Sequence, residues 1–335
     1  MEGAINNVTT IPLPRRRVGR TELEVTRIGL GTAFLLGLNQ VGEAGPAIAT
    51  VHAALAQGIN FIDTAPLYSR GQAEGVVGEA LQGVPRTQFV IQTKAGRYSR
   101  PEGGSYHDYS REAILRSVEN SLKLLRVDRL DSVLVHDADG DKFNQGAGAG
   151  IEGTYFRDAL DQAFPTLLDL RQQGVIGAVG AGMNQWQMEW EFARQVDVDC
   201  FLLAGRYTLL EQTSLDFLDY CHRRNIAVFL GGVFNSGILA TGPREGASYN
   251  YAAAPPPIIE KARRIDAVCA RHGVALRVAA LHFALAHPAV TSVVLGAQKP
   301  EEIASNVRAL EQHIPAALWA ELKHEALIEP GAPTP

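Results

Sequence analysis

The chain has 335 residues, of which 46% are hydrophobic, and this length suits one large α/β domain as well as two ordinary ones. Its formal net charge of -5 argues against a protein that binds nucleic acid or another polyanion. Three widely separated cysteines, together with the lack of an apolar leader or an 18-residue apolar run, predict a cytoplasmic protein without a membrane segment.

Short apolar runs alternate with longer amphipathic stretches along most of the chain. A β-hairpin is expected first, in RRRVGRTELEVTRIGLGT. Eight strands are then predicted near 27–32, 60–64, 89–94, 132–137, 175–182, 200–205, 226–232 and 292–297. They are continuous apolar runs, as expected for parallel strands that are buried on both faces. Between the third and fourth strands, residues 111–127 have the apolar stripe of an amphipathic helix.

This alternation predicts an α/β fold of the (β/α)8 TIM barrel type with an N-terminal hairpin. We expect one domain over residues 1–335, ordered from about 12 to 328, with 329–335 as a flexible tail. Two segments, 95–110 and 137–155, exceed the usual βα loop length of about 2–6 residues. They are expected to form the rim at the C-terminal face of the barrel.

Two glycine patterns, GLGTAF at 29–34 and GAGMNQ at 180–185, resemble the start of a dinucleotide-binding fingerprint. Both lack its third glycine, because Phe34 and Gln185 stand there. The sequence therefore argues against a Rossmann domain, and the absence of a GK[ST] motif argues against a P-loop. The later histidines lack ligand spacing with nearby acids or cysteines, so no metal site is predicted.

Titratable side chains follow three neighbouring predicted strands. Asp63 comes after NFI, Lys94 after FVIQT and His136 after SVLV, and Tyr68 lies five residues beyond Asp63. Each residue has an ordinary structural explanation when it is taken alone. Because the strands are adjacent, however, their ends bring the four side chains to the C-terminal mouth of a barrel, where such folds carry out chemistry.

These four residue types are suited to moving a proton. A free phenol has a pKa of about 10, and an ammonium close by would lower it. Asp63 would keep Lys94 charged, Lys94 would lower the pKa of Tyr68, and a neutral His136 would orient a substrate oxygen. None of them accepts electrons, so an acid/base reaction of an alcohol or carbonyl would need a redox cofactor.

Motifs along nearly the whole chain resemble the aldo-keto reductase family: GINFIDTAPLY, TK, LVHD and LGAQKPEEIASN. The resemblance implies that Asp63, Tyr68, Lys94 and His136 are a catalytic tetrad and that a nicotinamide dinucleotide is bound without a Rossmann fold. The cofactor region departs from the best-known members. Gly182, Met183 and Ala204 stand where polar residues hold the carboxamide in those members.

The resemblance also implies a set of cofactor contacts. Asn184 would replace one carboxamide contact, Tyr207 would stack beneath the nicotinamide, and Gly232 and Ser236 would lie in the pyrophosphate loop 231–237. Around the adenosine it implies Gly296, Gln298, Glu302 and Asn306. Glu302 favours NAD over NADP because a carboxylate repels a 2′-phosphate, although the nearby Lys299 offsets this charge.

Within the family, LLAGRYTLLEQ and GAVGAGMNQW resemble a bacterial subgroup of D-threo-aldose or L-fucose 1-dehydrogenases, with pyridoxal 4-dehydrogenases as close relatives. This implies oxidation of the C1 hydroxyl of free aldoses, such as L-fucose or D-arabinose, to the lactone. The alternatives are an NADP-dependent reductase of small aldehydes and ketones, a pyridoxal dehydrogenase, and a cofactor-binding regulatory subunit. Side chains expected to wall a sugar pocket are Arg97, Tyr98, Arg100, Tyr106, His107 and Tyr109.

Overall fold

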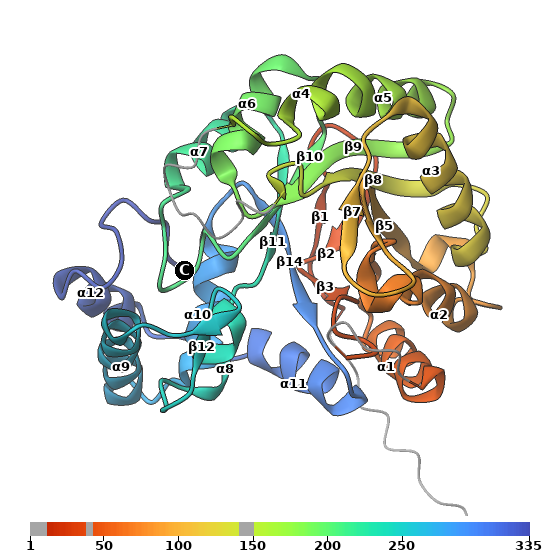
Figure 1. Ribbon diagram of the computed structural model, residues 1–335. Helices are drawn as coiled ribbons and strands as arrows, with labels where there is room; N and C mark the ends of the chain where they lie inside the picture. Colours follow the sequence, from red (N-terminus) through yellow and green to blue (C-terminus); the bar gives the residue numbers. More distant parts are fainter. Residues whose placement is uncertain (1–11, 38–42, 141–150) are drawn as a thin grey trace, which may run out of the picture.

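The computed structural model describes residues 12–37, 43–140 and 151–335 (Figure 1). Residues 1–11, which precede the expected start of order, and part of the predicted 137–155 loop lie outside the described residues. The described residues contain a closed barrel of eight parallel strands in the order β10-β11-β14-β3-β4-β5-β8-β9. These strands are β3 (Ile28–Gly31), β4 (Phe61–Asp63), β5 (Val90–Ala95), β8 (Leu130–His136), β9 (Ile176–Met183), β10 (Cys200–Ala204), β11 (Ala227–Gly231) and β14 (Val290–Gly296).

The barrel confirms the predicted fold class, and each predicted strand matches an observed one to within two residues at its start. All seven residues of β8 are buried, as expected for a parallel strand covered on both faces. The strand ends one residue earlier than the predicted 137. β8 stops at His136 because Asp137 has a left-handed φ of 47°, which is incompatible with a continuing strand.

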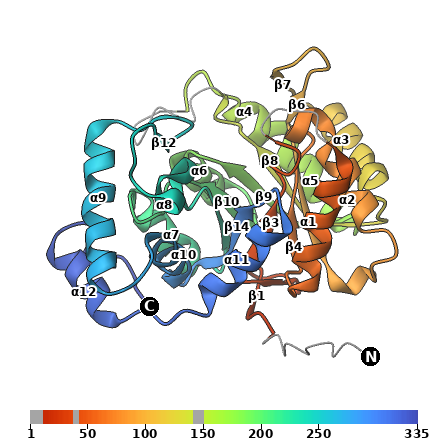
Figure 2. The same cartoon turned by 90° about the horizontal axis from the view of Figure 1, so that it is seen from below.

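Helices surround the strands, as the view from below shows (Figure 2). They are α1 (Ala44–Ala56), α2 (Ala73–Ala80), α3 (Arg111–Leu125), α4 (Phe156–Asp158), α5 (Phe164–Gln172), α6 (Trp186–Gln195), α7 (Leu215–Arg223), α8 (Ile238–Thr241), α9 (Pro256–Arg271), α10 (Leu276–Ala286), α11 (Pro300–Leu310) and α12 (Ala316–His324). Helix α3 is the one predicted from periodicity. Ser110 caps it by accepting a hydrogen bond from the Ala113 N–H, and its apolar stripe, with Ile114 and Val118, is buried.

The predicted N-terminal hairpin forms from β1 (Arg15–Arg17) and β2 (Glu24–Thr26). Its buried Val18 and Val25 belong to an apolar cluster inside the barrel that also contains Phe61 and Phe229, whose ring centroids are 4.7 Å apart. Apolar side chains from the hairpin therefore fill the N-terminal end of the barrel. A ligand has to enter from the opposite end.

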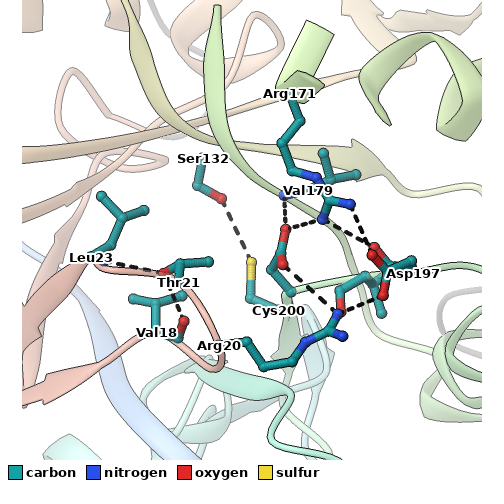
Figure 3. Close-up of polar contacts among 11 residues, drawn as sticks. Val18, Arg20, Thr21, Leu23, Ser132, Arg171, Val179, Asp197 and Cys200 are labelled. Carbon is teal, nitrogen blue, oxygen red and sulfur yellow. Dashed lines mark hydrogen bonds and ion pairs between the residues drawn. The ribbon is translucent and has the colours of Figure 1, made fainter. Parts of the chain in front are cut away.

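Charged side chains at this N-terminal end form a closed network (Figure 3). Arg20 donates to the Asp197 carboxylate at 2.6 Å, and Arg171 donates to Asp197 at 2.9 Å and to Asp199 at 2.7 Å. The buried Asp199 also accepts the backbone N–H of Val179 in β9 at 2.9 Å. Charge-assisted hydrogen bonds thus connect the hairpin, α5 and two barrel strands.

The C-terminal residues differ from the flexible tail expected for 329–335. Ala332 is fully buried, and the Glu329 N–H donates to Oε1 of Gln212 at 3.3 Å. The Ala332 side chain belongs to the cluster of buried residues that includes Ile328 and Trp319. This packing was not evident from the short polar sequence around it. The single closed barrel is the basis for our proposal that the chain forms one domain.

No single helix in the described part of the chain is long and apolar enough to cross a membrane. The α9–α10 pair meets the requirement only when the two helices are taken together, and it is bent by 98°.

Candidate active site

Asp63 and Lys94 form a buried ion pair at the ends of β4 and β5. Lys94 is 1% exposed, and its Nζ donates to both carboxylate oxygens of Asp63 at 2.8 Å and to the Thr64 carbonyl at 3.0 Å. Gln92 also donates to Asp63 Oδ1, at 2.9 Å. All three N–H groups of the ammonium are therefore used, which offsets the cost of burying two charges.

Tyr68 lies beside this pair. Lys94 Nζ is 4.7 Å from the centre of the Tyr68 ring, a cation–π contact with the ring face. The next three residues, Ser69, Arg70 and Gly71, have φ values of 51°, 55° and 84°. This left-handed turn is a strained backbone segment for two non-glycine residues, and it is the kind of geometry that is found at functional sites.

The pKa of Tyr68 moves in the direction opposite to the prediction. Burial, and then the charges of Asp63 and Asp137, raise the pKa of Tyr68 well above its usual range. The prediction was wrong because the N–H groups of Lys94 point to Asp63 and Thr64 and not to the phenol oxygen. The phenol therefore keeps its proton at neutral pH in the protein without ligand.

His136 ends β8 and contacts Tyr68 edge to face, with 5.8 Å between ring centres. Burial lowers the pKa of His136 to about 3, so the ring is neutral, as predicted. Its backbone is held by Tyr109, whose hydroxyl donates to the His136 carbonyl at 2.6 Å. A Cβ at Gly96, where φ is 110°, would lie 2.2 Å from the Tyr109 ring, so only glycine allows this packing.

A cavity of about 590 Å³ opens at the C-terminal ends of the strands. It extends from Asp63 and Tyr68 to the start of α11. Six residues predicted to contact a cofactor line it: Asn184, Gly232, Ser236, Gly296, Gln298 and Glu302. Asn184, expected to replace a carboxamide contact, also donates from Nδ2 to the Ala204 carbonyl at 3.1 Å.

Two other predicted cofactor residues lie elsewhere. Tyr207 is buried, and its ring stacks on Phe283 of α10 with 5.2 Å between ring centres. Asn306 is buried in α11, where its side-chain oxygen accepts a hydrogen bond from Arg277. Neither is among the residues around the cavity. In the case of Tyr207, the chain turns at Gly205, with φ of 71°, and the tyrosine then packs against α10.

The side chains of the first rim segment also differ from the prediction. Residues 97–107 form a hairpin of β6 (Arg97–Ser99) and β7 (Ser105–His107). Among the residues that line the cavity, none comes from 95–110. Tyr98 accepts the Gly96 N–H and His107 stacks on Tyr155, so these two side chains serve local packing, whereas Arg97 pairs with Asp137. Sequence composition could not separate such contacts from ligand contacts.

The structure adds cavity residues that the sequence did not indicate. Asn250 and Tyr251 form the two-residue turn between β12 (Ser248–Tyr249) and β13 (Ala252–Ala253), with φ values of 49° and 63°. Both line the cavity, and the Tyr251 N–H donates to Ser236 Oγ at 2.9 Å. Asparagine at the first position is a signal for this turn, but tyrosine at the second is unusual and hides it.

A family model described as the aldo/keto reductase family matches residues 27–325. The chain belongs to this family. It is therefore an NAD(P)-dependent oxidoreductase.

The similarity to other aldo/keto reductases extends over almost the whole chain. A pyridoxal 4-dehydrogenase of Microbacterium luteolum is 36% identical, over 94% of this chain and 98% of that protein. A D-threo-aldose 1-dehydrogenase of a Pseudomonas species is 33% identical, over 93% and 96%. The holo form of an aldo-keto reductase from Bacillus halodurans superimposes with a TM-score of 0.76 at 24% identity, over 95% and 97%, which supports the fold.

The cavity fits the dinucleotide that aldo/keto reductases use. Its wall contains Gly231 and Gly232, and a Cβ on Gly232 would lie 3.3 Å from the Gly205 nitrogen, in a backbone with φ of 61°. Glycines of this kind leave main-chain groups accessible, and such loops bind phosphate oxygens through backbone N–H groups. The loop 231–237 is therefore suited to a pyrophosphate, with Ser236 at its end.

Proposed function

We propose that this aldo/keto reductase oxidises the anomeric carbon of a free aldose, such as L-fucose or D-arabinose, and forms the lactone. The observation that carries the proposal is the buried Asp63–Lys94 pair in contact with Tyr68, next to a neutral His136. Identity of 33% to a protein named D-threo-aldose 1-dehydrogenase supports an aldose as the substrate.

Tyr68 and His136 have separate tasks in this reaction. His136 hydrogen-bonds to the reacting oxygen and holds it beside Tyr68. In oxidation the Tyr68 phenolate takes the proton of the substrate hydroxyl, and in reduction the phenol donates it back. Lys94 contacts the face of the Tyr68 ring, and Asp63 fixes the lysine in place. A bound nicotinamide dinucleotide supplies the acceptor for the hydride.

The raised pKa of Tyr68 affects the direction of the reaction. A protonated phenol is ready to act as an acid in reduction, whereas oxidation requires the phenolate as the base. Oxidation is therefore expected to become faster as pH rises above neutrality.

We propose NAD as the preferred cofactor. Glu302 lines the end of the cavity, and its Oε2 accepts the Gln298 N–H at 2.8 Å, so the carboxylate is fixed there. Glu302→Arg should shift the NADP to NAD ratio of kcat/KM by roughly tenfold or more, because a repulsion becomes a charge-assisted contact. Glu301→Arg, an exposed position on the same helix turn, is the control. A wild-type preference for NADP would contradict the proposal.

Pyridoxal is a second candidate substrate, and the observation that favours it is the 36% identity to a pyridoxal 4-dehydrogenase. Pyridoxal carries a hydroxymethyl group next to its aldehyde and closes to a cyclic hemiacetal. Oxidation of that carbon is the same chemical step as the oxidation of an aldose. The tetrad is therefore compatible with both, and the substrate contacts decide between them.

The test is NADH formation with L-fucose, D-arabinose, pyridoxal and simple aliphatic and aromatic alcohols, at equal enzyme and saturating NAD. The proposal predicts the highest kcat/KM for the aldoses. Turnover of pyridoxal with none of the aldoses would select the second candidate. A clear preference for the apolar alcohols would instead indicate a general reductase of small carbonyl compounds.

A further inference from the structure

Asp137 brings a second polar side chain to the mouth of the barrel. Consecutive side chains of a strand point to opposite faces, so the residue after His136 would normally face away from the site. The left-handed φ of 47° at Asp137 interrupts that alternation. As a result, Asp137 Oδ2 lies 3.7 Å from Nε2 of His136.

This backbone conformation is fixed by its neighbours. The Asp137 N–H donates to the Gly182 carbonyl at 3.0 Å, and the Asp137 carbonyl accepts the Gly140 N–H at 2.8 Å. Aspartate is among the few non-glycine residues that adopt left-handed φ at low cost. The turn therefore holds the carboxylate beside the catalytic histidine before any ligand binds.

Arg97 pairs with this carboxylate from the rim hairpin. Its Nη1 donates to Asp137 Oδ2 at 2.6 Å, and its Nε donates to Ser105 Oγ at 3.2 Å. The Arg97 and Asp137 side chains are only 20% and 15% exposed. Neither residue is among those that line the cavity, but both side chains keep some exposed surface, and Asp137 lies beside His136. Such a charged pair is expensive to bury unless it gains further hydrogen bonds.

The pair keeps unused hydrogen-bonding capacity. Among the described residues, the hydrogen bonds that reach the pair involve Asp137 Oδ2 and the Nη1 and Nε of Arg97. An acceptor, Oδ1, and a donor, Nη2, are left available side by side. The rim segment has another link to β8, because the Tyr109 hydroxyl donates to the His136 carbonyl.

We propose that Arg97 and Asp137 form a subsite for the hydroxyl on the carbon next to the reacting carbon. Asp137 Oδ1 accepts the hydrogen of that hydroxyl, and Arg97 donates to its oxygen. When His136 Nε2 holds the reacting oxygen of a sugar, the oxygen on the adjacent carbon lies about one hydrogen-bond length from that reacting oxygen. This second oxygen is then within reach of Asp137. The subsite selects α-hydroxy compounds over compounds with one functional group.

This inference rests on the proposed function, because it concerns the same reacting carbon. It nevertheless extends to the reverse reaction, in which D-glyceraldehyde carries the α-hydroxyl and propanal lacks it. Two substrate pairs therefore test it: oxidation of D-arabinose against 2-deoxy-D-ribose with NAD, and reduction of D-glyceraldehyde against propanal with NADH. The second pair gives an answer even if no aldose is oxidised, so failure of the subsite is distinguishable from failure of the proposed function.

The experiment compares kcat/KM ratios in wild type, Asp137→Asn and Arg97→Met. Asparagine tolerates the left-handed backbone, so Asp137→Asn is expected to fold. The control Glu102→Gln removes an exposed carboxylate from the same hairpin. We expect wild type to favour the α-hydroxy member of a pair by roughly ten- to hundredfold, because unpaired polar groups reject the analogue that lacks the hydroxyl.

In Asp137→Asn this ratio should fall toward one, with a rise in KM for the hydroxylated substrate, while Glu102→Gln keeps the wild-type ratio. Arg97→Met should lower the ratio in the same direction. A wild-type ratio near one in both pairs would overturn the subsite. So would an equal loss for both members of each pair, since that result would indicate a role in positioning His136.

Discussion

The two ends of the barrel treat their polar groups in different ways. At the N-terminal end, Asp131 accepts the Ile91 N–H at 2.7 Å and pairs with Arg86 at 2.7 Å. Asp199 repeats this arrangement with the Val179 N–H and Arg171. Each aspartate joins two neighbouring strands and is neutralised by an arginine. These two carboxylates are therefore satisfied within the protein.

At the C-terminal end the polar groups are left partly available. Tyr68 and His136 have strongly shifted pKa values, raised by burial for the phenol and lowered by burial for the imidazole. Left-handed residues gather there, at Ser69, Asp137 and Ser236. The N-terminal end thus holds polar groups that serve stability, whereas the C-terminal end holds the groups that we propose for catalysis, as is usual in barrels of this type. The Asp63–Lys94 pair, fully bonded yet next to Tyr68, contributes to both.

The largest expected effect is that of Tyr68→Phe at the C-terminal end. Removing the hydroxyl should lower kcat by about 10²–10⁴-fold, the usual contribution of a positioned acid/base group. The dissociation constant for NAD and the melting temperature should change little, because the hydroxyl acts on the substrate. Steady-state kinetics, a cofactor titration and a thermal melt check the three parts. A kcat loss of less than tenfold would contradict the role of Tyr68 as the acid/base group.

Asp199→Ala tests the N-terminal end. It removes the partner of Arg171 and leaves the buried Val179 N–H unpaired, so the free energy of unfolding should fall by about 1–3 kcal/mol with kcat unchanged. Asp197→Ala is a matched control that shares both arginines, but the Asp197 side chain is 60% exposed against 7% for Asp199. Its cost should stay below about 1 kcal/mol. Equal denaturation midpoints for the two variants, or a lower kcat in either, would contradict a purely structural role for the buried Asp199.

The two ends of the barrel are also expected to lose stability in different pH ranges. The pKa of His136 is about 3 in the folded protein, against 6.5 for an unperturbed histidine. Between these values the unfolded chain binds a proton that the folded protein does not, so stability is full above pH 6.5 and falls as pH drops toward 3. Hydrogen bonds from Arg20 and Arg171, acting against burial, lower the pKa of Asp197, so its contribution is lost only in more acidic solution.

His136→Gln should therefore lose less stability than wild type between pH 6.5 and pH 4, and exposed His324→Gln serves as the control. Urea denaturation across this range measures the difference. Parallel curves for wild type and His136→Gln would show that His136 is not held neutral by burial.

The strands and the location of Asp63, Tyr68, Lys94 and His136 near the barrel mouth were predictable from sequence because they depend on short-range patterns. A buried parallel strand is a continuous apolar run, and a polar residue at its end must reach the barrel mouth. The position of Tyr207 was not predictable, since its direction depends on the turn at Gly205 and on packing against Phe283. The sign of the Tyr68 pKa shift depends on where the Lys94 N–H groups point, which is set by three-dimensional contacts.

We propose that this chain moves a hydride from the anomeric carbon of an aldose while Tyr68 handles the proton. Oxidation of C1-deuterated D-arabinose with NAD, followed by mass and NMR analysis of the reduced cofactor, tests this proposal. We expect deuterium at C4 of the nicotinamide and, in Tyr68→Phe, the same label formed at a much lower rate. Reduced cofactor without deuterium, or labelling by Tyr68→Phe at the wild-type rate, would contradict it.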